Sequence, residues 1–356
     1  MRTGLILPPQ DPNLGPNDLV ELATLAEQKD YDAVFFPEAF AWDAVSVMTA
    51  VAVATSKVDL GTAILTLPVR TPAMTAMGAA TVDAVSGGRF NLGLGMGHRR
   101  MVTTYHGLDF APKIKRMREY VEIVRAIIAG EEMQYEGEYL RSSDAQFGST
   151  PVRREIPIYL AALHLDTMRL AGRIADGILP WYATPSWLER CLEELNSSAI
   201  KAGRDPSDID VALMIPVWVT DRPEEAREVA RSQMAWYNNF EFYNRMFFAA
   251  GFEEEADELR EAWRKIEADP VLKKRWEKSR DEEGADCGTS SLVSDEMLDS
   301  IFVIGDADYC RGRLASYADI GVTTAFVFPQ GVHENRTDSI ESFVNTIQGV
   351  APIGSM

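Results

Sequence analysis

The residues with the clearest chemical potential lie between positions 93 and 100, where glycines alternate along the chain and basic side chains follow them. Gly93, Gly95 and Gly97 close a short apolar run, and glycine lets a backbone pass close to a ligand. His98 comes next and can exchange a proton near neutral pH. The alternative is a tight strand-to-helix connection without a ligand, and glycine spacing alone leaves both open.

A basic segment follows these glycines. From position 99 to position 118 the only carboxylate is Asp109, whereas the basic residues are Arg99, Arg100, Lys113, Lys115, Arg116 and Arg118. A solvated helix face is the default interpretation, but the position beside a glycine turn favours an anionic ligand. The glycines are not a dinucleotide fingerprint, because they follow a later strand and lack an acidic partner for a ribose.

Composition limits the possible partners. The chain has 356 residues, 46% of them hydrophobic, and a formal net charge of −19 at pH 7. We expect no nucleic-acid partner, because duplex binding requires many lysines and arginines against the phosphates. There is no run of eighteen or more apolar residues and no signal-peptide pattern, so we expect a cytoplasmic protein without a membrane partner.

The cysteines and histidines predict neither a disulfide framework nor a metal site. Cys191, Cys287 and Cys310 are widely spaced, odd in number and include no CxxC pair. The four histidines show no HxxxH or HExxH spacing. We therefore predict packed thiols and no metal.

Eight strand-like segments alternate with helical patterns and must position the glycine turn. We expect the strands at residues 3–7, 33–36, 58–65, 90–94, 158–162, 177–181, 211–219 and 324–328. Eight βα units predict an α/β protein built as a closed parallel (β/α)8 TIM barrel, with a doubly wound sheet as the alternative.

Residues 233–299 depart from this alternation because they are polar and helical, with charged helices expected at residues 253–268 and 270–280. We interpret them as a helical insertion between strands seven and eight, which could be a lid, an oligomer contact or a solvated decoration. No linker or further repeat interrupts the chain, so residues 1–356 are expected to form a single domain.

Several segments together resemble the luciferase-like monooxygenase superfamily, and within it the oxidoreductases that use the deazaflavin coenzyme F420. They are residues 35–40 (FFPEAF), 60–66 (LGTAILT), 86–90 (SGGRF), 105–107 (YHG), 157–162 (PIYLAA), 170–172 (LAG), 175–177 (ADG) and 294–296 (SDE). The resemblance covers nearly the whole chain. It implies a barrel with the coenzyme at the carboxyl ends of the strands, a small-molecule substrate and a homodimer.

The same resemblance implies a set of coenzyme-binding residues, including a bulge with a non-prolyl cis peptide at Ala63–Ile64 under the flat ring. The set comprises Ala63, Ile64, Leu65 and Thr66 at the ring, Met96, Gly97 and His98 beside its polar edge, Arg99, Arg100 and Lys113 at the anionic tail, and Ala162, Leu163 and His164 near the phosphate. Coenzyme F420 ends in a phosphate and an oligoglutamate tail. The basic segment therefore favours it over flavin mononucleotide (FMN), the alternative cofactor.

Hydride transfer requires the protein to position a substrate and exchange a proton. The resemblance implies His98 as the leading proton donor, with Glu38 and Tyr105 as further candidates. Glu38 could instead pair with Arg70 or cap the helix that begins near Asp43.

Aromatic residues that follow the strands predict a substrate pocket. They are Phe40 and Trp42 after the second strand, and Trp181 and Trp218 at the ends of the sixth and seventh strands, although the last two could be core aromatics. Family members that oxidise a sugar phosphate carry a histidine and a glutamate where this chain has Ala39 and His98, which argues against that substrate.

The function that these observations favour is an F420-dependent oxidoreductase that reduces an activated C=C bond or an imine, or oxidises an alcohol. One alternative is an FMN-dependent monooxygenase that needs a reductase partner. The other is a non-catalytic flavin-binding barrel.

Overall fold

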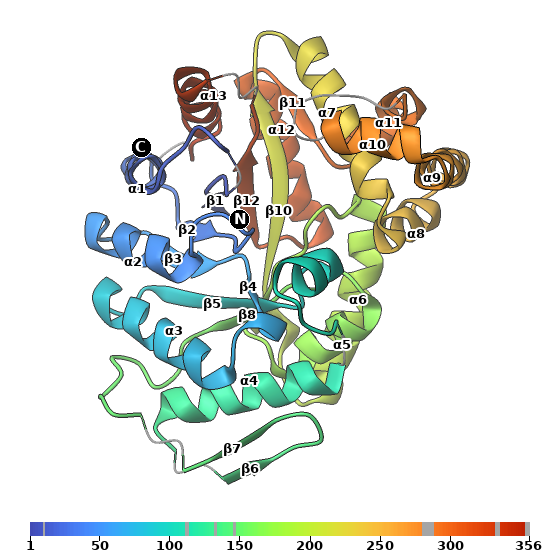
Figure 1. Cartoon of the computed structure of the whole chain (residues 1–356). Coiled ribbons are helices and arrows are strands. Elements are labelled where there is room, and N and C mark those ends of the chain that lie inside the picture. The colour runs from blue at the N-terminus through green and yellow to red at the C-terminus, as the bar shows by residue number, and fades with distance from the viewer. Residues whose placement is uncertain are drawn as a thin grey trace.

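The structure is a computed structural model that describes residues 1–9, 11–110, 114–131, 134–144, 147–279, 288–331 and 335–352. Parallel strands close into a barrel that helices surround (Figure 1). The barrel strands, in ladder order, are β1 (Arg2–Ile6), β2 (Ala33–Phe36), β3 (Asp59–Thr62) with its continuation β4 (Leu65–Thr66), β5 (Phe90–Gly95), β8 (Ile158–Leu160), β9 (Gly177–Ile178), β10 (Asp210–Val219) and β12 (Thr324–Pro329). Because β12 pairs with β1, the predicted TIM barrel is confirmed and the doubly wound sheet is wrong.

The outer helices are α1 (Pro16–Gln28), α2 (Ala44–Ala54), α3 (Pro72–Ser86), α4 (Ile114–Ala129), α5 (Leu165–Ile174), α6 (Pro185–Lys201), α7 (Pro223–Asn238), α12 (Ala307–Ser316) and α13 (Arg336–Gly349). A hairpin of β6 (Gln134–Glu136) and β7 (Arg141–Ser143) follows α4. Local sequence sets the helix ends, as α3 shows. The Thr71 hydroxyl accepts a hydrogen bond from the Met74 amide at its start, and Gly87 ends it in the left-handed conformation with φ of 70°.

Between β10 and β12 the chain adds a helical layer beyond α7. It consists of α8 (Glu241–Ala249), α9 (Glu253–Ala268), α10 (Pro270–Ser279), α11 (Asp295–Asp299) and the short strand β11 (Val303–Gly305). The predicted start of the insertion, position 233, falls inside α7. The sequence analysis did not predict β11, which pairs with β10. None of the described helices is long and apolar enough to cross a membrane.

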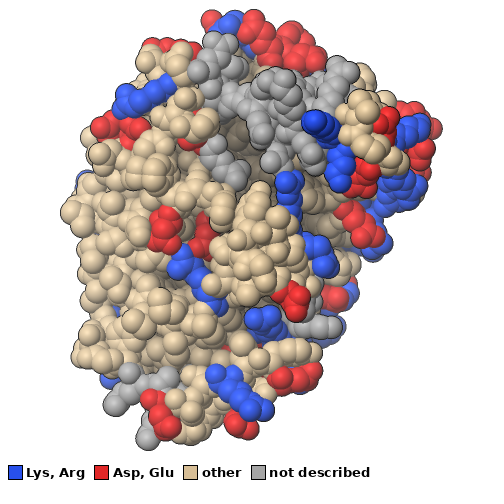
Figure 2. Space-filling model, in the orientation of Figure 1, with Lys and Arg blue, Asp and Glu red and all other residues tan. Residues whose placement is uncertain are grey.

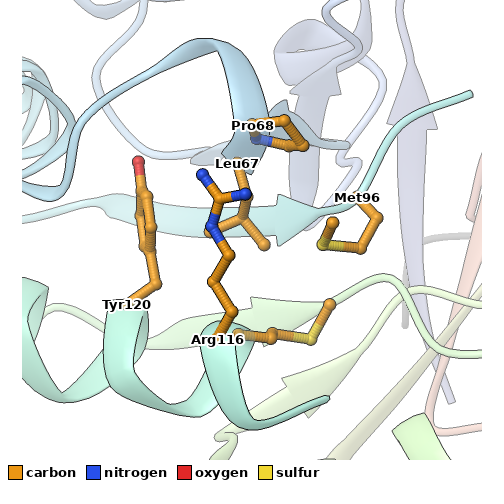
Figure 3. A pocket seen from close by; sticks show the side chains of 6 residues that line it. Leu67, Pro68, Met96, Arg116 and Tyr120 are labelled. Carbon is orange, nitrogen blue, oxygen red and sulfur yellow. The ribbon is translucent and has the colours of Figure 1, made fainter. Parts of the chain in front are cut away.

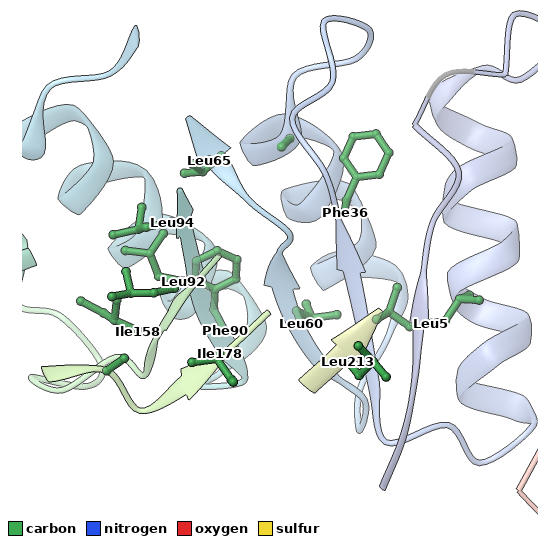
Figure 4. Close-up of a cluster of buried hydrophobic side chains, with 14 of the residues drawn as sticks. Leu5, Phe36, Leu60, Leu65, Phe90, Leu92, Leu94, Ile158, Ile178 and Leu213 are labelled. Carbon is green, nitrogen blue, oxygen red and sulfur yellow. The ribbon is translucent and has the colours of Figure 1, made fainter. Parts of the chain in front are cut away.

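Two layers of apolar side chains hold the barrel together. Outside it, strand residues that include Leu5, Leu60, Leu92 and Ile158 pack in the cluster that lies against the helices (Figure 4). Inside it, the rings of Phe35, Tyr159 and Phe326 fill the space. Glycines face these rings, since a Cβ atom at Gly4, Gly61 or Gly177 would lie within 2.5 Å of one of them.

A bulge interrupts the ladder between β3 and β5. Gly61 pairs with Asn91 and Leu65 pairs with Leu94, so the three residues 62–64 face the two residues 92–93. The Thr62 hydroxyl bridges the gap, donating to the Gly93 carbonyl and accepting from the Gly93 amide, both at 3.0 Å. The extra residue falls at the Ala63–Ile64 peptide, which is cis, so the predicted bulge and cis peptide are both confirmed.

Gly93→Ala is expected to destabilise the barrel by about 3 kcal/mol, because the added Cβ would lie 1.8 Å from the Thr62 carbonyl oxygen, a backbone atom that cannot move aside. The midpoint of urea unfolding measures this. The matched control is Gly312→Ala in α12, where no atom lies within 4 Å of the added methyl group and helix propensity favours alanine. Equal unfolding midpoints for the two variants would contradict the packing argument.

Candidate active site

The bulge and the glycines of β5 meet at the carboxyl end of the barrel. A Cβ on Gly95 would lie 2.9 Å from Ile64 and Ala161, and one on Gly97 would lie 2.7 Å from Thr66. Barrel packing therefore requires glycine at position 95, as it does at position 93. For these two residues the structure supports the alternative interpretation, in which the glycines serve a tight connection and not a ligand. Gly97 differs because it is exposed and has a φ of 66°, so its backbone is open to a ligand.

Glu38 connects the loop after β2 to the bulge. Its Oε2 atom accepts a hydrogen bond from the Thr66 amide at 2.8 Å, and its Oε1 atom accepts one from Arg70 Nε at 2.7 Å. The same guanidinium pairs with Asp43 at 2.6 Å. The Arg70 pairing weighed for Glu38 is thus confirmed, and both carboxylate oxygens take part in fixing the loop.

His98 follows the glycines and is half-buried. Its ring centroid lies 5.3 Å from that of Phe240, which belongs to the connection between α7 and α8. Burial lowers the pKa of His98 below its ordinary 6.5. The imidazole is therefore neutral at pH 7, and it can accept a proton or donate a hydrogen bond there.

Tyr105, Phe40 and Trp42 lie at the rim of the barrel mouth. Tyr105 ends a π-helical turn (Met101–Tyr105), and its ring lies 4.4 Å from that of Phe40. Phe40 and Trp42 line a pocket of about 450 Å³ together with Asp11, Pro12, Leu14 and Ala41. Two of the four predicted substrate-pocket residues thus line one cavity.

Trp181 and Trp218 contact the insertion instead. Trp181 donates a hydrogen bond to the Tyr237 hydroxyl at 3.2 Å, and its ring lies 5.1 Å from that of Phe328. Trp218 is 6% exposed and packs with Tyr182 in the cluster beneath the insertion helices. Because it is buried, Trp218 is a core aromatic and does not line the predicted substrate pocket.

The loop after β8 has a fixed geometry. Ala162 is buried, and the Leu163 carbonyl accepts a hydrogen bond from Trp187 Nε1 at 3.0 Å. His164 is exposed and caps α5, its Nδ1 atom accepting from the Asp166 amide at 3.3 Å. A neutral imidazole that accepts a hydrogen bond at Nδ1 carries its proton on Nε2, which can then act as a donor.

The basic segment is only partly anchored. Arg99 and Arg100 are exposed, and the Arg99 guanidinium lies 4.9 Å from the ring centroid of Phe110. Lys113 lies outside the described residues. Arg116 is half-buried beside Leu67, Pro68, Met96 and Tyr120 (Figure 3), and no described carboxylate pairs with it.

The thiols and the metal-ligating side chains of the described residues are the remaining groups with chemical potential. Among the residues that the structure describes, no group of three or more histidines, cysteines or carboxylates could hold a metal ion. Cys191 and Cys310 are buried free thiols, as predicted, and burial raises the pKa of each to about 12. Cys287 lies outside the described residues.

A group of aromatic side chains from α7, α8 and the connection between them is the part of this region that the sequence analysis missed. Tyr237 stacks on Tyr182 at 4.2 Å, Phe240 faces His98, and Phe242 lies 6.0 Å from His164. The density of aromatic residues at positions 236–243 was the available signal. It did not indicate which strand ends they would cover, because that depends on how the insertion folds back.

Comparisons with known proteins identify the family and the fold of the chain. The luciferase-like monooxygenase family model matches residues 1–324. A Mycobacterium tuberculosis protein named for a coenzyme F420-dependent oxidoreductase activity is 29% identical over 88% of this chain and 90% of its own. A 5,10-methylenetetrahydromethanopterin reductase of Methanolobus tindarius is 28% identical over 91% and 92%. The solved coenzyme F420-dependent tetrahydromethanopterin reductase of Methanopyrus kandleri superposes with a TM-score of 0.79 at 23% identity, covering 99% of both chains. The chain belongs to the luciferase-like monooxygenase family, which confirms the resemblance.

The pKa of His98 can be measured by following its Cε1 proton by NMR, and we expect a midpoint below 6.5 that rises when Phe240→Ala exposes the ring. Between the lowered pKa and 6.5 the unfolded chain binds a proton at His98 and the folded chain does not. Stability from this group is therefore lost as the pH falls through that window. A titration midpoint at or above 6.5 in the wild-type protein would contradict the conclusion that burial lowers the pKa of His98.

Proposed function

We propose that this chain is an oxidoreductase that uses coenzyme F420 and transfers a hydride to or from a small organic molecule. The substrate would carry an activated C=C or C=N bond, or an alcohol and carbonyl pair. The observation that carries the proposal is the strand bulge at residues 62–64, which lies at the carboxyl end of β3 where Gly95 and Gly97 of the neighbouring chain segment approach it. The F420-dependent relatives support the choice of coenzyme.

The residues around the bulge fit a flat polar group. Thr66 Oγ1 is buried with no hydrogen-bond partner among the described residues, and the exposed backbone of Gly97 lies next to it. The bulge residues Ala63, Ile64 and Leu65 would support the ring together with Met96. His164 and the start of α5 would donate to a phosphate, as helix amino termini do.

When bound, the coenzyme supplies or accepts the hydride. His98 is the residue that we propose exchanges the accompanying proton, because it is half-buried next to Gly97 and has a lowered pKa. In its neutral form it takes the proton of an alcohol, and in the reverse direction its protonated form returns one. Glu38 serves as a positioning residue through its bonds to Arg70 and Thr66.

Arg99 and Arg100 would hold the anionic tail, so Arg99→Gln and Arg100→Gln should each weaken F420 binding about three- to tenfold and reduce its salt dependence. Equilibrium titration of the purified protein with F420 and with FMN measures this. Arg173→Gln in α5, an exposed arginine without a described ion-pair partner, is the charge-matched control. Tighter binding of FMN than of F420 would overturn the choice of coenzyme and return the protein to the monooxygenase alternative.

We also propose that the chain forms a homodimer through α2 and α3. Helix α2 contains no charged residue, and the one in α3, Asp83, is buried. Exposed apolar side chains on this face include Val53, Met74 and Met77. Figure 2 shows the corresponding flank, on the left, as an uncharged surface. Two chains of net charge −19 repel one another, so an uncharged face supports their contact.

Met77→Asp places a charge at a side chain that is 52% exposed on α3 and should convert the dimer into monomers at micromolar concentration, as sedimentation velocity would show. Val152→Asp, at a similarly exposed valine outside both helices, is the control and should leave the dimer intact. A monomeric wild-type protein, or a Met77→Asp dimer, would refute the proposed interface.

A further inference from the structure

The cavity at the barrel rim has the size of a small-ligand site. It holds about 450 Å³ between the loop after β1, which contributes Asp11 and Leu14, and the loop after β2, which contributes Phe40 and Trp42. Pockets that bind small molecules span roughly 300–1,000 Å³. The hydrogen bond that the Glu38 carboxylate accepts from the Thr66 amide places the loop after β2 beside the bulge, so the cavity adjoins the proposed hydride-transfer site.

Two aromatic side chains form walls whose faces are open to solvent. Phe40 is 60% exposed and Trp42 is 46% exposed, which is unusual for such large apolar groups. Each is held in place. The Trp42 indole N–H donates to the Leu14 carbonyl at 3.1 Å, and the Phe40 ring packs against Tyr105.

The backbone of Phe40 supports a functional interpretation. Its φ is +54°, in the left-handed region that a bulky residue rarely occupies. A conformation of this kind persists only where its surroundings enforce it, and such positions gather at ligand sites. Here it presents the aromatic ring at the cavity instead of in the core.

The charge around the cavity is negative. Asp11 is the charged residue that lines it, and its carboxylate is oriented by a hydrogen bond from the Asn13 amide at 2.8 Å. Nearby, Glu38 and Asp43 share the single cation Arg70, and Asp18 pairs with Arg336. None of the described residues that line the cavity is a lysine or arginine, so these residues offer an anionic ligand no cationic partner.

We propose that this cavity binds an organic cation, a quaternary ammonium group or a protonated amine, between Phe40 and Trp42 and against Asp11. Aromatic faces attract such cations through the ring quadrupole, and a carboxylate supplies the opposite charge. Binding of a cation in this cavity does not depend on the proposed function. The further statement that the cation is part of the substrate does rest on the proposed function. It narrows the substrate class to molecules that carry a positive charge near the reacting bond.

Titration of the full-length protein with benzyltrimethylammonium, followed by tryptophan fluorescence and calorimetry, tests the cavity. The matched ligand is neopentylbenzene, which has the same shape without the charge. We expect the cation to bind about tenfold more tightly than the neutral compound. Asp11→Asn should weaken cation binding about five- to tenfold and leave the neutral compound unaffected, whereas Trp42→Leu should weaken cation binding by a similar factor and the neutral compound less.

The charge control is Asp208→Asn, an exposed aspartate before β10 at the opposite end of the barrel. Phe40→Leu provides a second variant of the aromatic wall that is safe for folding, because the side chain is mostly exposed. Equal affinities for the two ligands, or an equal loss in Asp208→Asn and Asp11→Asn, would overturn the proposal. A separate F420 titration of the same samples reports on the coenzyme site, so failure of the cavity and failure of the proposed function are distinguishable.

Discussion

The close approach of β5 to the bulge after β3 is the constraint on which the site depends. Where the extra residue of β3 leaves the ladder, the amide and carbonyl groups of Gly93 lose their strand partners, and the Thr62 hydroxyl replaces both. The short distance between the two strands leaves no room for a Cβ atom at Gly93. The same geometry brings Thr66 to Gly97 and lets Glu38 bind the Thr66 amide. Three loops of the barrel mouth are thereby fixed relative to one another.

The opposite end of the barrel carries a different set of polar contacts. The Tyr159 hydroxyl donates to Asp210 at 2.9 Å, and the Thr324 hydroxyl donates to the same carboxylate at 2.8 Å. Burial and the Asp210 carboxylate raise the pKa of Tyr159, so this phenol stays protonated. These bonds join three strands and involve no open loop. The division between a stabilising end and an open end is the usual one in TIM barrels, and it assigns the cavity, His98 and the basic segment to the same face.

The insertion between β10 and β12 shapes that face from the side. Tyr182 lies directly after Trp181 with a φ of +60° and stacks on Tyr237 of α7, which accepts the Trp181 hydrogen bond. Phe240 then lies against one side of His98 and adds to the burial that lowers the pKa of this histidine. A segment between β10 and β12 thus helps to bury a histidine that follows β5. Because the insertion is tied to the barrel by a buried cluster, it is part of the wall of the site.

The sequence by itself determined the eight βα units, the end of α3 at Gly87 and, through family resemblance, the cis peptide at Ala63–Ile64. Hydrophobic periodicity, glycine turns and helix caps act over a few residues, so they can be read along the chain. Only the tertiary structure decided that Glu38 pairs with Arg70, that Trp218 is buried while Trp42 is open, and that Phe240 faces His98. Those contacts join residues up to 142 positions apart, as from His98 to Phe240. They depend on strand register and on how the insertion folds back, which no local pattern encodes.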